Sequence, residues 1–224
     1  MTDGAPQDLP QTTVLSRMSL RDQAVEVLRE MLLSGGLAQG DRINEVELAG
    51  RLGISRGPLR EAIQRLGAEG IVEFRQNRGA FVRTIGAEDL DQLFQFRELI
   101  ECKATELVAT RGSAADIARL REHVEVTGAS LRAGEAYPRT AGDLHRLVLE
   151  MCGNPYLQVA GDDMHNQVRL ARTQVRRGPQ WAADVQEEHD RIVTALERRD
   201  PDAAARAMAE HLRSSLTHMM EPDD

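Results

Sequence analysis

Residues 44–82, NEVELAGRLGISRGPLREAIQRLGAEGIVEFRQNRGAFV, contain two short helical patterns followed by two strand patterns. Asn44 can cap the first helix and Gly53 ends it, whereas Ser55 can cap the second, which tolerates Pro58 in its first turn. Apolar residues at helical spacing predict the inward positions, which are Val46, Leu48, Ala49, Leu52, Leu59, Ala62, Ile63 and Leu66. Two short helices about a glycine turn predict a helix-turn-helix.

Patterns on either side complete a small domain. After the second helix, apolar residues alternate around the polar turn Asn77–Gly79, which predicts a β-hairpin. Upstream, residues 20–34 predict another helix, which Gly35 and Gly36 stop. Its expected inward stripe is Leu20, Ala24, Val27, Leu28, Met31 and Leu32. Together these elements predict a winged helix-turn-helix, with the hairpin as the wing.

Strand patterns vanish from Ala87 onward, where five or six amphipathic helices can be counted. They are predicted at residues 87–110, 113–133, 138–152, 154–177, 180–199 and 201–220. The expected fold is therefore mainly α, with an N-terminal winged helix-turn-helix of three helices plus a β-hairpin, followed by an all-α bundle. The expected parts are a flexible tail at 1–18, the winged domain at 19–85 and the helical domain at 86–224.

The composition is that of a soluble globular protein, because 41% of the 224 residues are apolar and 29% are charged. Two cysteines, Cys102 and Cys152, and no CxxC motif argue against a disulfide framework or a cysteine-type zinc site. The first nineteen residues lack the basic start and apolar segment of a signal peptide, and no apolar run reaches membrane-spanning length. The sequence therefore predicts a cytoplasmic protein without membrane contact.

Charge is distributed unevenly along the chain. Residues 51–83 carry seven arginines and three glutamates, a local net charge of +4, although the whole chain has a net charge of -8. Residues 86–224 hold 17 basic and 25 acidic side chains and would repel a phosphate backbone. The uneven charge predicts that double-stranded DNA binds the N-terminal domain alone.

Two parts of the chain resemble a known family. Residues 37–82, LAQGDRINEVELAGRLGISRGPLREAIQRLGAEGIVEFRQNRGAFV, resemble the DNA-binding domain of GntR-family transcription regulators. Residues 145–157, HRLVLEMCGNPYL, and 187–212, EEHDRIVTALERRDPDAAARAMAEHL, resemble the FCD domain of the FadR subfamily. The resemblance implies a bacterial regulator that binds operator DNA through its winged domain and senses a small effector in its helical domain.

The DNA-contacting residues are predicted at the start of the second helix of the helix-turn-helix. A helix that enters the major groove with its N-terminal end needs small or polar side chains first and arginines one turn apart. That pattern is present in Ser55, Arg56, Gly57 and Arg60. The resemblance implies that Arg56 and Arg60 contact bases and that Ser55 and Gly57 lie at phosphates. It also places Arg78 and Gly79, at the tip of the wing, in the minor groove.

Three histidines far apart in sequence, His145, His189 and His211, lie on predicted helices. Each is more often a hydrogen-bonded core residue when taken singly. The resemblance implies that the set binds a divalent metal, with Zn or Ni favoured because imidazole suits these ions. The metal would then orient a carboxylate effector.

The resemblance departs from the family at the fourth ligand. Family members usually have an Asp four residues before the first histidine, and this chain has Ala141 there. Asp143 lies two residues before His145, so on a regular helix it would point about 200° away. With Thr140 it is expected to form a capping box instead. We therefore predict an incomplete ligand set and a metal affinity below that of relatives that keep the Asp.

Other polar side chains are weaker candidates. By resemblance Arg97 points into the cavity at an acidic effector; the alternative is an ion pair with Glu101 on the helix surface. Asn166 and Arg169 are further candidates for contact with the effector. Three histidines match no motif and are expected to be surface or packing residues: His123, His165 and His218.

Three functions are compatible with these patterns. The first is a ligand-controlled homodimer on an inverted-repeat operator, because a two-fold protein matches a two-fold site. The second is a DNA-binding regulator whose C-terminal domain only dimerises. The third is a three-histidine metalloenzyme, but the sequence has no HExxH or GxSxG motif. We therefore expect a regulator and not an enzyme.

Overall fold

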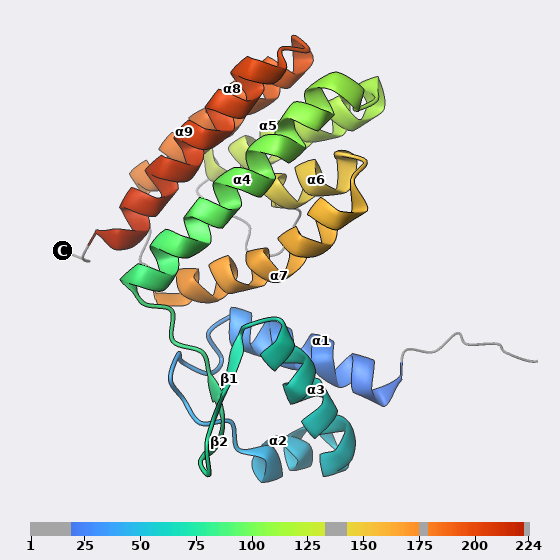
Figure 1. The fold of residues 1–224 in the computed structure, drawn as a ribbon, viewed down its shortest axis with the longest axis vertical. Coiled ribbons are helices and arrows are strands. Elements are labelled where there is room, and N and C mark those ends of the chain that lie inside the picture. The colour runs from blue at the N-terminus through green and yellow to red at the C-terminus, as the bar shows by residue number, and fades with distance from the viewer. Residues whose placement is uncertain (1–18, 133–142, 175–178, 222–224) are drawn as a thin grey trace, which may run out of the picture.

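The computed structural model describes residues 19–132, 143–174 and 179–221. It confirms the predicted fold class, with a small winged helix-turn-helix domain beside a bundle of helices (Figure 1). The N-terminal elements are α1 (Leu20–Leu33), α2 (Glu45–Leu52), α3 (Arg56–Ala68), β1 (Val72–Arg75) and β2 (Gly79–Val82). The bundle consists of α4 (Ala87–Arg111), α5 (Ala114–Arg132), α6 (Leu144–Met151), α7 (Pro155–Ala171), α8 (Pro179–Glu197) and α9 (Pro201–Met220).

Caps fix the ends of the helix-turn-helix. The Asn44 side chain accepts hydrogen bonds from the Val46 and Glu47 backbone amides of α2, and Gly53 ends that helix at a φ of 65°. All four predicted inward residues of α3 are buried. The predictions for α1 and α2 were partly wrong, because Leu20, Val27 and Val46 are 60%, 50% and 65% exposed. The buried face of α1 comprises the predicted Ala24, Leu28 and Leu32 together with Val25 and Leu33.

The wing is an antiparallel hairpin in which Arg75 pairs with Gly79. Its turn lies where it was predicted, with φ values of 58° at Asn77 and 94° at Gly79. The segment before α2 pairs with the other edge of β2, because the Val82 amide donates to the Asp41 carbonyl at 2.9 Å. This additional β-pairing attaches the base of the wing to the segment that leads into α2.

The bundle is built around the long helices α4 and α9, which pack along each other, with α8 beside α9 (Figure 1). Its core contains apolar residues of every helix of the bundle, among them Ala104, Val108, Leu120, Leu144, Ile192 and Met208. The helix predicted at 138–152 begins at Leu144, and α7 ends at Ala171 in a short 3-10 turn, Arg172–Gln174. The tail at 1–18 lies outside the described residues. Within the described ranges, no helix is long and apolar enough to cross a membrane.

Helix α7 of the bundle packs against the winged domain (Figure 1). At the centre of this interface, the joint between the two domains, lies Glu69, which caps the C-terminal end of α3 and is only 3% exposed. Its carboxylate accepts hydrogen bonds from Arg29 of α1 at 2.7 and 2.9 Å and from Arg65 of α3 at 3.2 Å. It also accepts one from Asn166 of α7 at 3.3 Å. One carboxylate therefore ties together α1, the end of α3 and the bundle.

The neighbouring residue of α7 strengthens the same joint. Gln167 donates to the backbone carbonyl of Glu69 at 3.3 Å and accepts from Arg83 at 3.2 Å. Gly70 has a φ of 74°, and a Cβ atom there would lie 2.6 Å from the Gln167 amide nitrogen. A side chain at this position would be strained by the positive φ and would displace the Gln167 amide, so glycine favours the contact.

Replacing Glu69 with Gln should lower the free energy of unfolding by about 1–2 kcal/mol, because the Arg29 guanidinium loses its buried anionic partner. The measurement is the thermal unfolding midpoint of the full chain. Glu26→Gln is the matched control, since Glu26 also pairs with Arg29 but its side chain is 58% exposed. The control should stay within about 0.5 kcal/mol of the parent. Equal midpoints for both variants would contradict a central role for Glu69.

Candidate functional site

The first candidate surface is the exposed N-terminal end of α3. Ser55 is the N-cap of this helix but its side chain makes no capping hydrogen bond, so its hydroxyl can serve an outside partner. The side chains of Arg56 and Arg60 are 55% and 58% exposed. A Cβ at Gly57 would meet nothing within 4 Å, so the backbone is open to close approach. All four residues are exposed at the start of α3, and their contact with DNA stays a prediction.

Glu45, at the start of α2, contacts both arginines of this surface. Arg60 Nε donates to its carboxylate at 2.6 Å, and Arg56 Nη2 does so at 3.5 Å. The hydrogen bond from Arg60 lowers the pKa of Glu45, so the carboxylate stays ionised and holds the two guanidinium groups side by side. The sequence prediction missed this residue, although an acidic side chain at a helix N-terminus was visible in the pattern.

The wing carries a second basic group. Arg78 and Gly79 are exposed at its turn, where the sequence placed them. Arg75 is engaged within the wing, because it forms an ion pair with Glu73 and its guanidinium lies 4.2 Å from the centre of the Phe81 ring. Arg78 is therefore the arginine of this hairpin best placed for an outside partner.

The second candidate site lies inside the bundle, where His145 of α6, His189 of α8 and His211 of α9 meet. All three are buried, with exposed fractions of 1%, 3% and 2%. One ligand atom from each lies within 4.8 Å of the others. The convergence that the metal hypothesis requires is therefore present.

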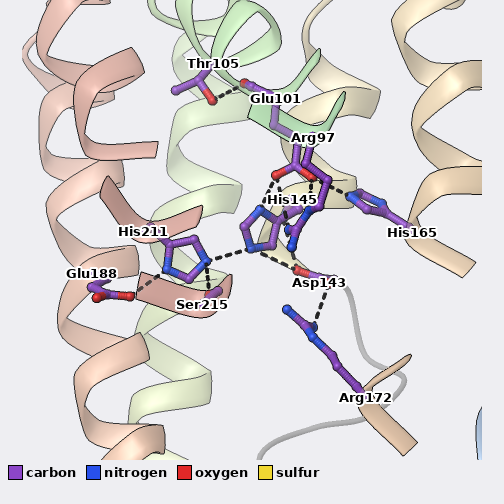
Figure 2. Close-up of polar contacts among 10 residues, drawn as sticks. All are labelled: Arg97, Glu101, Thr105, Asp143, His145, His165, Arg172, Glu188, His211 and Ser215. Atoms are coloured by element: carbon purple, nitrogen blue, oxygen red, sulfur yellow. Dashed lines mark hydrogen bonds and ion pairs between the residues drawn. The ribbon is translucent and has the colours of Figure 1, made fainter. Parts of the chain in front are cut away.

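Two carboxylates fix the protons of this cluster. His145 Nδ1 donates to Glu101 of α4 at 2.6 Å, and His211 Nδ1 donates to Glu188 of α8 at 2.7 Å (Figure 2). The hydrogen on each Nδ1 leaves the Nε2 atom as the free acceptor, and the two Nε2 atoms face each other at 3.0 Å. Metal-binding histidines commonly donate their second ring nitrogen to a carboxylate in this way.

Two facing lone pairs repel unless a proton or a cation lies between them. Burial lowers the pKa values of His189 and His211 well below the usual range, so these rings are neutral. Two nitrogens that each lie about 2.1 Å from one zinc ion, at an angle of about 90–110°, are about 3.0–3.4 Å apart. The donor set, the neutral rings of His189 and His211, and the spacing of the His145 and His211 Nε2 atoms therefore fit a divalent metal.

Arg97 forms the predicted ion pair with Glu101, but the pair is buried and not on the helix surface. Arg97 Nε donates to Glu101 Oε1 at 2.8 Å, and both side chains are 0% exposed. Burial acts to raise the pKa of Glu101, but the charge of Arg97 and the hydrogen bonds from His145 and His165 hold it well below the usual range. Glu101 thus stays ionised at the centre of the bundle.

His165 of α7 is a further member of this site that sequence reasoning missed. It was expected to be a surface or packing residue, but its Nε2 donates to Glu101 Oε1 at 3.2 Å and it is 7% exposed. Two buried atoms beside Glu101, Arg97 Nη1 and His165 Nδ1, have no hydrogen-bond partner among the described residues. Buried polar atoms without a partner, here a guanidinium donor and a ring nitrogen, indicate a place for a polar ligand.

Asp143 contradicts the prediction that it points away from the histidines. It is the N-cap of α6 and accepts from the His145 amide at 3.2 Å. Its Oδ1 also lies 3.8 Å from His145 Nε2, and its Oδ2 lies 3.7 Å from Arg172 Nη1 (Figure 2). The φ and ψ angles of Asp143 are -53° and 127°, so the periodicity of a helix does not apply to it. Ala141 and Thr140 lie outside the described residues.

Two predicted effector contacts have other partners. Asn166 donates to Glu69, and Arg169 donates to Glu30 of α1 at 3.2 Å. Both side chains thus belong to the joint between the domains, because they leave α7 towards the winged domain. The last two histidines stay outside the cluster: His123 is half-buried with a pKa lowered by burial, and His218 donates to the Ser214 carbonyl at 2.8 Å.

The residues that the sequence prediction missed had weak signals. Glu188 directly precedes His189, and Glu101 follows Arg97 by one helical turn. Both positions are also ordinary for surface glutamates. Only the packing of α4, α6, α8 and α9 identifies these two carboxylates as partners of histidines.

Comparisons with known proteins agree with the two parts of the fold. Residues 20–82 match the family described as bacterial regulatory proteins, gntR family, and residues 91–214 match the FCD domain. The chain is similar to the Nta operon transcriptional regulator of Aminobacter aminovorans, with 31% identity over 85% of this chain and 90% of that protein. It is also similar to the transcriptional repressor RspR of Escherichia coli, with 25% identity over 87% and 86% of the two chains. Among solved structures, E. coli McbR/YncC has a similar fold, with a TM-score of 0.76, 20% identity, and coverage of 91% and 98%.

Proposed function

The chain belongs to the GntR family of bacterial regulatory proteins and carries an FCD domain, and we propose that a small carboxylate effector, held through a divalent metal, controls its binding to operator DNA. It is a DNA-binding transcription regulator and not an enzyme. The proposal includes membership of the FadR subfamily, a cytoplasmic location, and the division into a winged domain at 19–85 and an effector domain at 86–224.

The DNA-binding part of the proposal rests on the exposed end of α3. Arg56 and Arg60 would contact base edges in the major groove, while Ser55 and Gly57 lie against phosphates. Arg78 and Gly79 would enter the adjacent minor groove. The observation that favours this surface is its exposure, since the two arginine side chains are more than half exposed and have only Glu45 as an ionic partner among the described residues.

The effector part of the proposal rests on one observation, the 3.0 Å separation of the His145 and His211 Nε2 atoms. A divalent ion would be held by these two atoms and by a ring nitrogen of His189. Zinc or nickel suits these imidazole donors. Such an ion would offer its open positions to a carboxylate, and the unpartnered Nη1 of Arg97 would donate to the same anion.

The test is a titration of the chelator-treated protein with Zn²⁺, alone and with each of a set of small dicarboxylates and hydroxy acids. We expect Zn²⁺ to raise the melting temperature and one carboxylate class to raise it further only when Zn²⁺ is present, because binding to the folded state is stabilising. The same carboxylate should change the affinity for operator DNA. A melting temperature that zinc, nickel and manganese all leave unchanged would contradict the proposed metal site. A DNA affinity that no carboxylate changes would contradict the proposed control by an effector.

We also propose that the protein is a homodimer that binds an inverted repeat, with the helical domain as the dimer interface. Residues 86–224 on their own should therefore run as a dimer in sizing with light scattering at micromolar concentration. A clean monomer across that range, with a folded helical spectrum, would contradict this interface. The alternative function, a C-terminal domain that only dimerises, predicts the dimer but no zinc binding.

A further inference from the structure

We propose that Arg42, in the segment that leads into α2, contacts a phosphate of the DNA backbone beside the wing. This role rests on the proposed binding of operator DNA and adds one residue to the binding surface. Arg42 lies outside both predicted groups of DNA contacts, which are at the start of α3 and at the turn of the wing. It reaches the wing through the β-pairing of its own segment with the edge of β2.

The β-pairing determines which face of the wing carries Arg42. Arg42 pairs with Phe81 of β2 in an antiparallel bridge, and backbone hydrogen bonds of 2.9 Å on either side hold the bridge. Residues paired across antiparallel strands point to the same face, so Arg42 shares the face of Phe81. Ala80 and Val82 point to the other face and are 3% and 0% exposed. The core therefore lies behind the sheet, and Arg42 lies on its outer face.

On this face the Arg42 side chain extends toward the turn of the wing. Gly79 lies two residues before Phe81 in β2, on the same face and nearer the turn. A Cβ atom at Gly79 would lie 3.9 Å from both Nε and Nη2 of Arg42, so the guanidinium lies against the backbone of the wing. Glycine has no side chain that would separate the two. The Arg42 guanidinium therefore flanks the turn that carries Arg78.

The charge of Arg42 is available to an outside partner. Its side chain is exposed, and no carboxylate of the described residues forms an ion pair with it. Arg75 lies on the same outer face, but it pairs with Glu73 and its guanidinium lies over the Phe81 ring. A guanidinium without a partner can form charge-assisted hydrogen bonds with phosphate oxygens. Arg42 is therefore better placed than Arg75 to bind an anion outside the protein.

The position beside the turn favours a phosphate over a base. If Arg78 and Gly79 enter the minor groove as proposed, the turn lies between two sugar-phosphate backbones. A cation on the flank of the turn then meets the wall of the groove and not the base edges. The direction of the surface agrees, because the wing turn and α2 both lie at the end of the winged domain away from the bundle (Figure 1). Three residues after Arg42, Glu45 contacts the two arginines of the α3 surface.

The experiment measures the affinity of the full-length protein for two DNA duplexes at several salt concentrations. One duplex is selected by the parent protein from a random library, and the other is unrelated. We expect Arg42→Ala to weaken the binding of both duplexes by a similar factor, about 10-fold or more at about 0.1 M salt. The slope of log affinity against log salt should become shallower by about 2, because each subunit of a dimer loses one phosphate contact. The melting temperature should stay near that of the parent, because the side chain is exposed.

Two matched variants accompany Arg42→Ala. Arg42→Lys keeps the positive charge and should keep most of the salt slope, because a phosphate accepts either cation. Arg119→Ala removes the same charge from an exposed position of α5 in the bundle and should bind both duplexes like the parent. A parent-like salt slope in Arg42→Ala would overturn the phosphate contact and leave the proposed surface of α3 standing. Loss of affinity for the selected duplex alone would indicate a base contact and would also overturn it. A parent protein that binds neither duplex would overturn both this contact and the proposed DNA binding.

Discussion

His211→Ala should lower the zinc affinity of the protein by about 100-fold or more, which amounts to loss of measurable binding at micromolar zinc. Removing one ligand that contacts the ion costs at least as much as removing an outer partner, for which the loss is about 10–100-fold. The substitution also takes away the Nε2 atom that lies 3.0 Å from His145 Nε2. The measurement is titration calorimetry with Zn²⁺ on the chelator-treated full chain.

His218→Ala provides the control on the same helix. His218 lies two turns after His211 in α9, but its Nδ1 donates to the Ser214 carbonyl and it is not part of the histidine cluster. The control variant should bind zinc like the parent. Circular dichroism should show the same helix content for both variants. Retention of parent-like zinc affinity by a folded His211→Ala would exclude the cluster as the metal site.

Arg56→Ala and Arg60→Ala should each weaken operator binding by about 1–3 kcal/mol per contact. Each substitution occurs twice in a dimer on a two-fold operator, so the total loss is about 2–6 kcal/mol, or roughly 30-fold and more in the dissociation constant. The fold should be unaffected, because the two side chains are 55% and 58% exposed. The variants should also discriminate less between operator and unrelated DNA.

The DNA for this measurement is a duplex that the parent protein selects from a random library. Selection is needed because the protein sequence does not determine the operator sequence. Affinities are compared at one fixed salt concentration, because phosphate contacts make them depend on salt. Arg51→Ala is the control, as an exposed arginine of α2 outside the start of α3. We expect it to lose less. If Arg51→Ala weakened binding as much as Arg60→Ala, general charge and not base recognition would explain the effect.

Most of the fold followed from local patterns, because caps, glycine stops and apolar spacing act within one helix or hairpin. The turn at Asn77–Gly79, the buried stripe of α3 and the ends of α4 and α9 were predicted within a few residues. Errors arose where another element determines which face is buried. Val27 has the spacing of a core residue but is 50% exposed, because the face of α1 toward α3 is centred on Leu28.

The chemistry of the interior was less predictable. The three histidines were identified by resemblance, and their convergence is present in the fold. Glu188 and His165 were missed, and Glu101 was expected only as a partner of Arg97, since the contacts of these residues with the histidine cluster cross between helices and no spacing rule connects them. Asp143 was misassigned for a related reason. The expectation assumed a helix at its position, whereas α6 starts one residue later and turns the side chain toward the cluster.

Helix α7 contacts both the histidine cluster of the bundle and the winged domain. His165 donates to Glu101 beside the histidine cluster, and the next two residues, Asn166 and Gln167, hold the end of α3 through Glu69. An effector that moved α7 would therefore alter the support of α3, the helix proposed to contact the operator. Linkage makes this relation reciprocal, so DNA that changes the position of α3 must change the affinity for the effector by the same factor. Occupied operators and free protein in one cell would then respond to different concentrations of the same small molecule.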